Sequence, residues 1–148
     1  MAAIPATDDP PSLAGGVPVR ELVTLERGEE PVALVPLDSE APLGIGTAQG
    51  VVKRVAVEPA PARDSWEVIG LKDGDVVVGG APAPDDAELV FLASDAQLLH
   101  FSAGSVRPQG RPAGGMAGIN LSAGASVLAF SVVLPHDEAL VVTVSGST

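Results

Sequence analysis

The sequence predicts an all-β protein, an incomplete propeller-like array of four-stranded blades. Three observations support this prediction. Short apolar runs alternate with polar turns, a pair of such runs recurs after about fifty residues, and no segment has the caps and apolar stripe of a helix. Seventeen glycines and fourteen prolines also favour short elements and argue against long helices.

The first half of the repeated unit is a hairpin. Leu43–Val55 (LGIGTAQGVVKRV) and Leu89–Phe101 (LVFLASDAQLLHF) each consist of an apolar strand, a short polar turn and a second apolar strand. Such a pattern is typical of two antiparallel strands joined by a tight turn. A third copy begins at Leu140–Thr148 and stops inside its turn.

The second half of the unit also recurs. Leu71–Val78 (LKDGDVVV) matches Leu121–Leu128 (LSAGASVL), each with a leucine, a turn centred on glycine and an aliphatic strand. An earlier copy precedes them, because Ala14–Leu22 resembles Ala113–Leu121 and Gly28–Val35 then corresponds to the segment from Gly124 onward.

These copies divide the chain into units. Residues 1–11, rich in Pro and Asp, are expected to form a disordered tail or linker. The remaining residues form a partial array over 12–148. Its expected parts are a half blade at 12–35, blades at 36–82 and 83–134, and a half blade at 135–148.

The composition excludes several classes of protein. The 148 residues suit one ordinary domain, and 46% hydrophobic content is not that of a disordered chain. Without cysteine there are no disulfides, thiol nucleophiles or cysteine-ligated zinc sites. With only two histidines, a histidine metal site is not expected. The sequence contains no apolar run of membrane-spanning length and no secretory signal pattern at its start.

The formal net charge is −11, which counts against non-specific nucleic-acid binding by the chain as a whole. The acidity is uneven, since residues 1–42 carry a net −6 and the much longer segment 43–148 a net −5. Any contact with DNA therefore requires a local basic patch. Lys53 and Arg54, adjacent in VVKRV, are the first candidates for such a patch.

No enzymatic site is predicted. The chain has no Gly-x-x-x-x-Gly-Lys-Ser/Thr phosphate loop, and Gly44–Gly50 is read as a hairpin turn because no helix follows it. Ser102, His100 and Asp95 are the residue types of a Ser-His-Asp catalytic triad, but nothing in the sequence indicates a group that orients the base. The Asp-rich turns at 73–75 and 85–86 lack the ligand number of a calcium loop. We expect no catalytic residue, no bound cofactor and no metal.

The repeats resemble the C-terminal domain of the A subunit of bacterial type IIA topoisomerases, that is, DNA gyrase and topoisomerase IV. The resemblance covers about residues 12–148. The segments that carry it are LGIGTAQGVVKRV (43–55), WEVIGLKDGDVVVG (66–79) and AELVFLASDAQLLHFSAGSVRPQGRPAGGMAGINLSAG (87–124). The alanine- and valine-rich composition is similar to that of topoisomerase IV from high-GC bacteria.

The resemblance implies a β-pinwheel, a disc of about six blades whose basic rim wraps DNA. It places Lys53, Arg54, Arg107 and Arg111 on or near this rim. From the residues alone, other roles are open. Strand alternation points Lys53 and Arg54 to opposite faces, and charged residues on an edge strand also prevent aggregation. The two arginines of the loop could bind phosphate or pack on a neighbouring blade.

Three further residues have plainer readings. Trp66 is expected to anchor a core or a contact between blades. His100, between Leu99 and Phe101, is read as an outward-facing strand residue, although a rim position is possible. Lys72 lies in a turn beside Asp73 and Asp75, where local charge pairing is expected.

Two departures from the family shape the functional expectation. Only two complete blades are predicted, and no QRRGGRG-like basic box, which in the family accompanies gyrase-type wrapping, is present. We therefore expect non-sequence-specific binding and bending of double-stranded DNA, in the bacterial cytoplasm and on the nucleoid. The family's tyrosine nucleophile is absent, since the chain contains no Tyr. The implied protein partners are the ATPase B subunit of the enzyme and the remainder of its topoisomerase polypeptide, and Mg²⁺ and ATP belong to the intact enzyme.

An alternative from another class remains open. The blade array could be a structural or protein-interaction module that docks on the enzyme core or associates with itself. An incomplete array leaves strand edges that favour such association.

Overall fold

The computed structural model describes residues 16–142, and the tail predicted at 1–11 lies outside them. The predicted all-β architecture is confirmed. Seven strands and two short 3₁₀ helices make up the regular structure of these residues. In chain order they are η1 (Val19–Glu21), β1 (Leu43–Thr47), β2 (Val51–Val55), β3 (Val77–Pro82), β4 (Glu88–Ala93), β5 (Leu98–Ser102), η2 (Ala103–Ser105), β6 (Met116–Ala117) and β7 (Val127–Val133).

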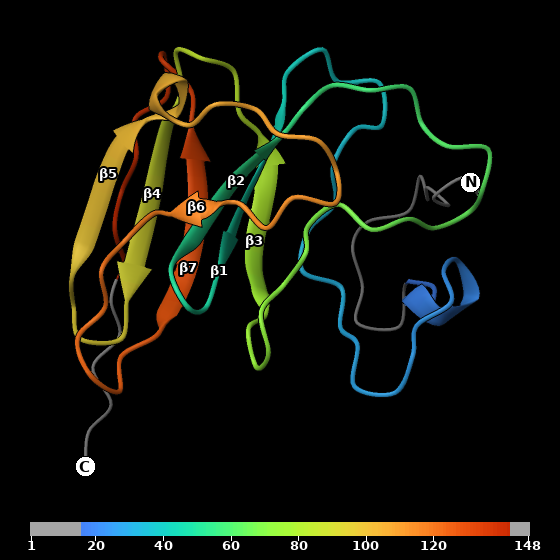
Figure 1. Ribbon diagram of the computed structural model, residues 1–148, viewed down its shortest axis with the longest axis horizontal. Coiled ribbons are helices and arrows are strands. Elements are labelled where there is room, and N and C mark those ends of the chain that lie inside the picture. The colour runs from blue at the N-terminus through green and yellow to red at the C-terminus, as the bar shows by residue number, and fades with distance from the viewer. Residues whose placement is uncertain (1–15, 143–148) are drawn as a thin grey trace.

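The strands form two antiparallel sheets that lie side by side (Figure 1). Sheet A has the order β3-β1-β2-β6, and sheet B has the order β5-β4-β7. The two predicted hairpins are the β1–β2 and β4–β5 pairs. Residues 16–42 extend beyond sheet A together with part of the loop that joins β2 to β3 (Figure 1).

The internal repeat is visible in the registers of the two sheets. Ile45 pairs with Gly80 in sheet A, as Phe91 pairs with Phe130 in sheet B. The pairing shifts after Gly46 in β1 and after Leu92 in β4, which are the same place in the repeat. The repeat therefore describes equivalent positions in space, and residues of the two sheets can be compared one by one.

One strand crosses from the second unit to the first. β6 pairs with β2 through Met116 and Ala117, which face Val52 and Val51. Residues 83–134, predicted as one blade, therefore contribute a strand to sheet A, and sheet B keeps three strands among the described residues. The sequence pattern treats each blade as a continuous segment, whereas the structure interlocks two neighbouring blades.

The segment predicted as a half blade at 12–35 contains no strand in its described part, only η1. Its side chains are almost all exposed. A two-stranded hairpin without a third strand or a packed face is marginal in water, which accounts for the irregular backbone. In the half blade predicted at 135–148, residues 135–142 also contain no strand, and 143–148 lie outside the described residues.

The two sheets pack through glycines on one side and a phenylalanine on the other. Phe130 of β7 lies against Gly46 of β1 and Gly79 of β3, and a Cβ at Gly79 would meet the Phe130 carbonyl oxygen at 2.6 Å. Phe130 also packs on Phe91, with ring centroids 5.0 Å apart. The absence of side chains on Gly46 and Gly79 thus allows sheet B to approach the backbone of sheet A.

This packing predicts the effect of a single added methyl group. In Gly46→Ala the new Cβ would overlap the Phe130 ring, so the free energy of unfolding should fall by about 1–3 kcal/mol, as for other overpacked cores. Gly110→Ala is the matched control, because its Cβ would meet no atom closer than 3.8 Å. Urea denaturation of both variants provides the measurement. Equal stability of the two would contradict the glycine-mediated packing.

Candidate nucleic-acid interface

The turn between β1 and β2 is fixed by its own polar side chains. Thr47 is fully buried, and its hydroxyl accepts a hydrogen bond from the Val51 amide at 3.1 Å. The Asp75 carboxylate accepts from the Gln49 amide at 2.9 Å. Gly50 ends the turn with a φ of +84°, a left-handed conformation that favours glycine. The turn predicted over Gly44–Gly50 is therefore a hairpin connection that sets the start of β2.

Lys53 and Arg54 follow on β2, and both side chains are buried. Lys53 is 0% exposed and Arg54 1% exposed. They point to opposite faces of sheet A, as strand alternation predicts. The expectation that they lie at an exposed rim is not met, since neither charged group reaches the surface that a DNA phosphate could contact.

The Lys53 ammonium is held by three backbone carbonyls. Its Nζ donates to the carbonyl oxygens of Val68 at 2.8 Å, Arg111 at 2.7 Å and Ala113 at 2.6 Å. An ammonium group has three donors, so its hydrogen-bonding capacity is filled. Burial lowers the pKa of Lys53 below its ordinary value, while the carboxylates of Glu67 and Glu58 act in the opposite direction. The three carbonyl oxygens and these two carboxylates compensate the buried charge.

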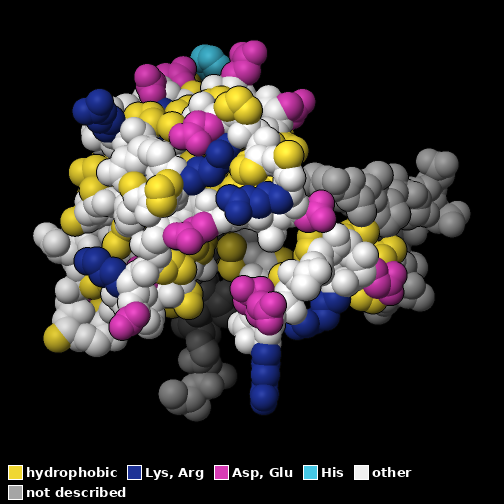
Figure 2. Space-filling model, turned by 45° about the vertical axis from the view of Figure 1, so that its right-hand side comes forward, with side chains coloured by type: hydrophobic (Ala, Val, Ile, Leu, Met, Phe, Trp, Pro, Cys, Tyr) yellow, Lys and Arg dark blue, Asp and Glu magenta, His cyan; other side chains and the backbone are white. Residues whose placement is uncertain are grey.

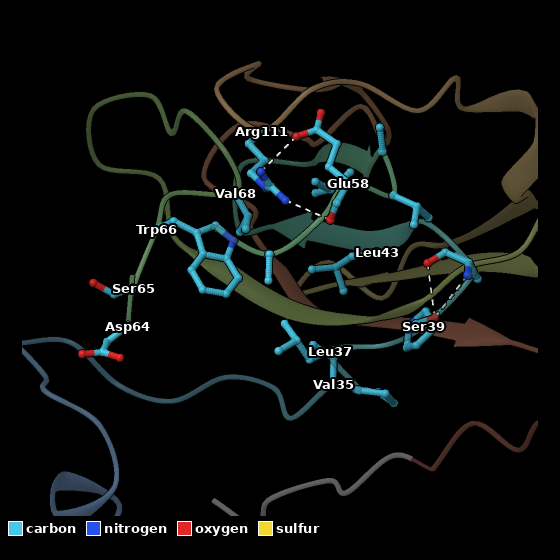
Figure 3. Close-up of a pocket in the computed structure, with 17 residues that line it drawn as sticks. Val35, Leu37, Ser39, Leu43, Glu58, Asp64, Ser65, Trp66, Val68 and Arg111 are labelled. Carbon is cyan, nitrogen blue, oxygen red and sulfur yellow. Dashed lines mark hydrogen bonds and ion pairs between the residues drawn. The ribbon is translucent and has the colours of Figure 1, made fainter. Parts of the chain in front are cut away.

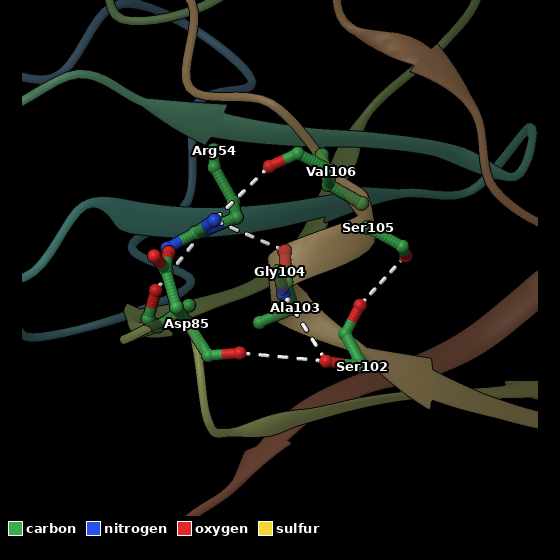
Figure 4. Close-up of polar contacts among 8 residues, drawn as sticks. Arg54, Asp85, Ser102, Ala103, Gly104, Ser105 and Val106 are labelled. Carbon is green, nitrogen blue, oxygen red and sulfur yellow. Dashed lines mark hydrogen bonds and ion pairs between the residues drawn. The ribbon is translucent and has the colours of Figure 1, made fainter.

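Arg54 joins sheet A to the beginning of sheet B (Figure 4). Its Nε donates to the Ala83 carbonyl at 3.0 Å, and its Nη1 donates to the carbonyls of Ala103 at 3.0 Å and Val106 at 3.1 Å. The remaining nitrogen, Nη2, contacts Asp85 Oδ1 at 2.5 Å. The Arg54 guanidinium therefore connects β2 of sheet A to the segments on either side of the β4–β5 hairpin of sheet B.

The loop from Arg107 to Gly115, here called the arginine loop, is attached to sheet A at several points. The Gln109 amide donates to the Arg54 carbonyl at 2.8 Å, and the Ala56 amide donates to the Gln109 carbonyl at 2.8 Å. Lys53 binds two carbonyls of the same loop. Gly115, with a φ of +83°, passes close to the Val52 carbonyl. The backbone that carries both predicted arginines is thus fixed.

The two arginines of the loop differ in their surroundings. The Arg111 side chain is 21% exposed, and it forms an ion pair with Glu58 at 3.0 Å and donates to the carbonyls of Glu58 and Pro59 (Figure 3). Arg107 is exposed, and no hydrogen bond or ion pair joins its side chain to another residue within 16–142. Arg107 therefore has its full donor capacity at the surface.

On the face drawn in Figure 2, the exposed cations do not form one continuous basic surface. Five of the eight basic residues are exposed: Arg20, Arg27, Arg63, Lys72 and Arg107. Figure 2 shows Lys and Arg side chains set among Asp and Glu on the face drawn. Such a distribution agrees with the acidic net charge and limits any phosphate contact to local groups.

The other singled-out residues occupy separate places. His100 is exposed on β5, as expected, and lies 3.5 Å from the Glu88 carboxylate. Trp66 is half-buried and lines a largely apolar cavity of about 410 Å³ beside Leu37 and the Arg111–Glu58 pair (Figure 3). The partners that the sequence missed are Asp85, noted there only as part of an Asp-rich turn, and Glu58, which has no motif of its own.

Within 16–142, no three His, Cys, Asp or Glu side chains come together as ligands for a metal ion. Among the helices of this part of the chain, none has the length and apolarity needed to cross a membrane.

Three comparisons relate the chain to known proteins. A family model described as the DNA gyrase C-terminal domain, a beta-propeller, matches residues 87–134. The A subunit of DNA gyrase from Salmonella typhimurium strain LT2 is 28% identical over 137 residues, which are 89% of this chain and 15% of that protein. Its counterpart from Staphylococcus aureus strain MRSA252 is 32% identical over 139 residues, which are 88% of this chain and 16% of that protein. The chain thus spans about a sixth of these relatives.

Solved structures give the same result for the fold. The C-terminal domain of DNA topoisomerase IV matches with a TM-score of 0.72 at 22% identity, over 82% of this chain and 40% of that one. The DNA gyrase A C-terminal domain matches with a TM-score of 0.58 at 24% identity, over 76% and 39%. The resemblance predicted from the repeats is confirmed: over most of its length the chain is similar to the C-terminal β-pinwheel domain of the A subunits of type IIA topoisomerases.

Proposed function

We propose that this chain is a non-catalytic DNA-binding module that contacts duplex phosphates without reading bases and bends the duplex. The observation that supports the proposal is the exposed guanidinium of Arg107. It lies on the arginine loop, whose backbone is hydrogen-bonded to β2. Phosphate contacts of this kind position a protein on DNA but carry no sequence information. The similarity to gyrase and topoisomerase IV domains supports the same assignment.

The four predicted cations take two different roles in this proposal. Arg107, and Arg111 when it leaves Glu58, would contact phosphate oxygens, for which the planar guanidinium is suited. Lys53 and Arg54 would not touch DNA. Lys53 holds two carbonyls of the arginine loop, and Arg54 fixes sheet B against sheet A. They would thereby set the position of the surface that binds.

The proposed setting is the intact topoisomerase. The tyrosine nucleophile, the Mg²⁺ site and the ATPase would belong to other parts of that enzyme, in the bacterial cytoplasm at the nucleoid. The chain itself would need no cofactor. Its contribution to DNA topology would be the path that it imposes on a bound duplex, with bending favoured at deformable steps.

The test is duplex binding as a function of salt. In a gel-shift titration with a random-sequence duplex, affinity should fall steeply between about 50 and 200 mM NaCl. Arg107→Ala should weaken binding about three- to tenfold at low salt and reduce the slope of log K against log [salt] by about 1, the loss of one phosphate contact. The effect should be the same for unrelated sequences.

Arg27→Ala is the matched control, since it removes another exposed arginine, from the segment without strands. Its affinity for the duplex should equal that of the wild type. If the two variants bind equally, the arginine loop is not the contact surface. If the wild-type chain shows no salt-dependent binding, the proposal is wrong for this chain.

A further inference from the structure

The contact between sheets A and B suggests how a second copy of the chain could associate with the first. That contact has two parts: β6 lies along the outer edge of β2, and Phe130 enters the gap left by Gly46 and Gly79. The equivalent positions in the two sheets are known from their registers. Each part of the contact can therefore be compared with the equivalent positions on the two surfaces where no blade is packed.

The first surface is the outer side of sheet B. The edge of β5 that corresponds to the paired edge of β2 has no strand partner among residues 16–142. Leu98, equivalent to Val52, is 44% exposed, whereas Val52 is 0% exposed beneath β6. Val90, Leu92 and Ala129 extend this apolar surface across the sheet and are half-buried or exposed. His100 and Ser131, which pair with Val90, lie on the same side of the sheet. We call Val90, Leu92, Leu98, His100, Ala129 and Ser131 the outer face of sheet B.

The second surface is the outer side of sheet A. Trp66–Ile69 corresponds to Met116–Ile119 in the fifty-residue repeat. Ile69 is buried against Ile45, just as Ile119 belongs to the core around Phe91. Residues 66 and 67, unlike Met116 and Ala117, pair with no strand among the described residues. The apolar cavity beside Trp66 lies on this side of sheet A, next to Leu43 and Val55 (Figure 3).

The side chains of these two surfaces are complementary in size. At the contact within the chain, the large residue is Phe130 of sheet B and the gap is at Gly46 of sheet A. On the two outer surfaces the order is reversed. Sheet A carries Gly80 at the position of Phe130, and sheet B carries Leu92 at the position of Gly46. A large residue would again face a small one.

We propose that copies of this chain associate head to tail, with the outer side of sheet A in one copy packed on the outer face of sheet B in the next. Residues 66 and 67 of the first copy would pair with the edge of β5 that has no strand partner within 16–142, as β6 pairs with β2. The contact would be apolar at Leu92 and Leu98, whereas His100 stands where sheet A has Arg54. Such a heterologous contact forms a closed ring or an open filament.

The net charge separates this association from DNA binding. Each copy carries a formal charge of −11, so like charges oppose association at low ionic strength. Salt screens that repulsion, and higher NaCl should strengthen head-to-tail association. Binding to DNA should weaken under the same change. The proposal rests on the fold and is independent of the proposed function.

Sedimentation velocity over a range of protein concentrations tests the proposal. The sedimentation coefficient should rise with concentration, and more steeply at high NaCl. Leu98→Lys should abolish the rise, because a lysine at the free edge blocks strand pairing and adds a charge to the apolar face. Leu98 is partly exposed, so the variant should keep the wild-type circular dichroism. Val76→Lys, in the turn before β3 and 56% exposed, is the control and should associate like the wild type.

Trp66 gives a second readout, since it is the single tryptophan of the chain and lies in the proposed contact. Its emission should shift to shorter wavelength with concentration in the wild type and not in Leu98→Lys. A monomer at every concentration would overturn the proposal, as would association that Leu98→Lys leaves unchanged. Protection of the β5 amides from hydrogen exchange in a monomeric sample would also overturn it, because the edge would then be covered within one chain.

Discussion

Replacement of Lys53 by methionine is expected to lower the free energy of unfolding by about 3–5 kcal/mol, a large part of the stability of a small domain. Methionine fills a similar volume but donates no hydrogen bond. The carbonyls of Val68 and Arg111 would then lose the hydrogen bond from Lys53, and that of Ala113 would keep only the Gly70 amide at 3.3 Å. Each unsatisfied group costs about 1–3 kcal/mol. Urea denaturation followed by circular dichroism provides the measurement.

Lys72→Met is the matched control for this experiment. Lys72 is exposed in the turn before β3, so its replacement should change stability by less than about 0.5 kcal/mol. A similar small effect at Lys53 would show that the three carbonyls find other partners. Lys53→Met should also weaken DNA binding, by releasing the arginine loop, if the proposed function is right.

Arg54→Met is expected to be as destabilising, by about 3–5 kcal/mol, for a different structural reason. The variant loses the bonds to Ala83, Ala103 and Val106, all of which belong to the second unit. The connection between the sheets would be weakened more than either sheet itself. We therefore expect the unfolding of the variant to be broader than that of the wild type, or to divide into two transitions.

Asp85→Asn separates the contribution of the ion pair from that of the carbonyls. The Asp85 side chain is 85% exposed, although the guanidinium that it meets is buried. Exposed carboxylates contribute little to such a pair, so this variant should lose at most about 1 kcal/mol. If Asp85→Asn were as harmful as Arg54→Met, the ion pair and not the carbonyl cluster would hold the blades together.

The hairpins could be predicted from the sequence because they depend on neighbouring residues. Leu43–Val55 and Leu89–Phe101 contain both strands and the turn, so the pattern and the structure coincide. The position of β6 could not be predicted in this way. Its partner, β2, lies more than sixty residues earlier, and a strand of two residues has too little pattern to identify its neighbour.

The burial of Lys53 and Arg54 could not be predicted from the local sequence pattern either. The groups that bind them are mostly backbone carbonyls, which exist at every residue and leave no signature in a sequence. One signal was available within the repeat. Leu99 occupies the position of Lys53 in the second hairpin, and a leucine there indicates that this position faces a core.

The exchange of β6 between the units has a consequence for the order in which the chain can fold. During synthesis, β1, β2 and β3 are complete long before Met116 and Ala117 emerge. Val68, the first of the three carbonyl acceptors of Lys53, is also made early. Its acceptors at Arg111 and Ala113 arrive about sixty residues after the lysine itself. Sheet A therefore stays incomplete until the second hairpin has been made. Until then the outer edge of β2 is unpaired, and Lys53 lacks two of its three carbonyl acceptors. The two blades cannot mature one after the other like independent repeats, and a ribosome that pauses before residue 113 would expose an aggregation-prone intermediate.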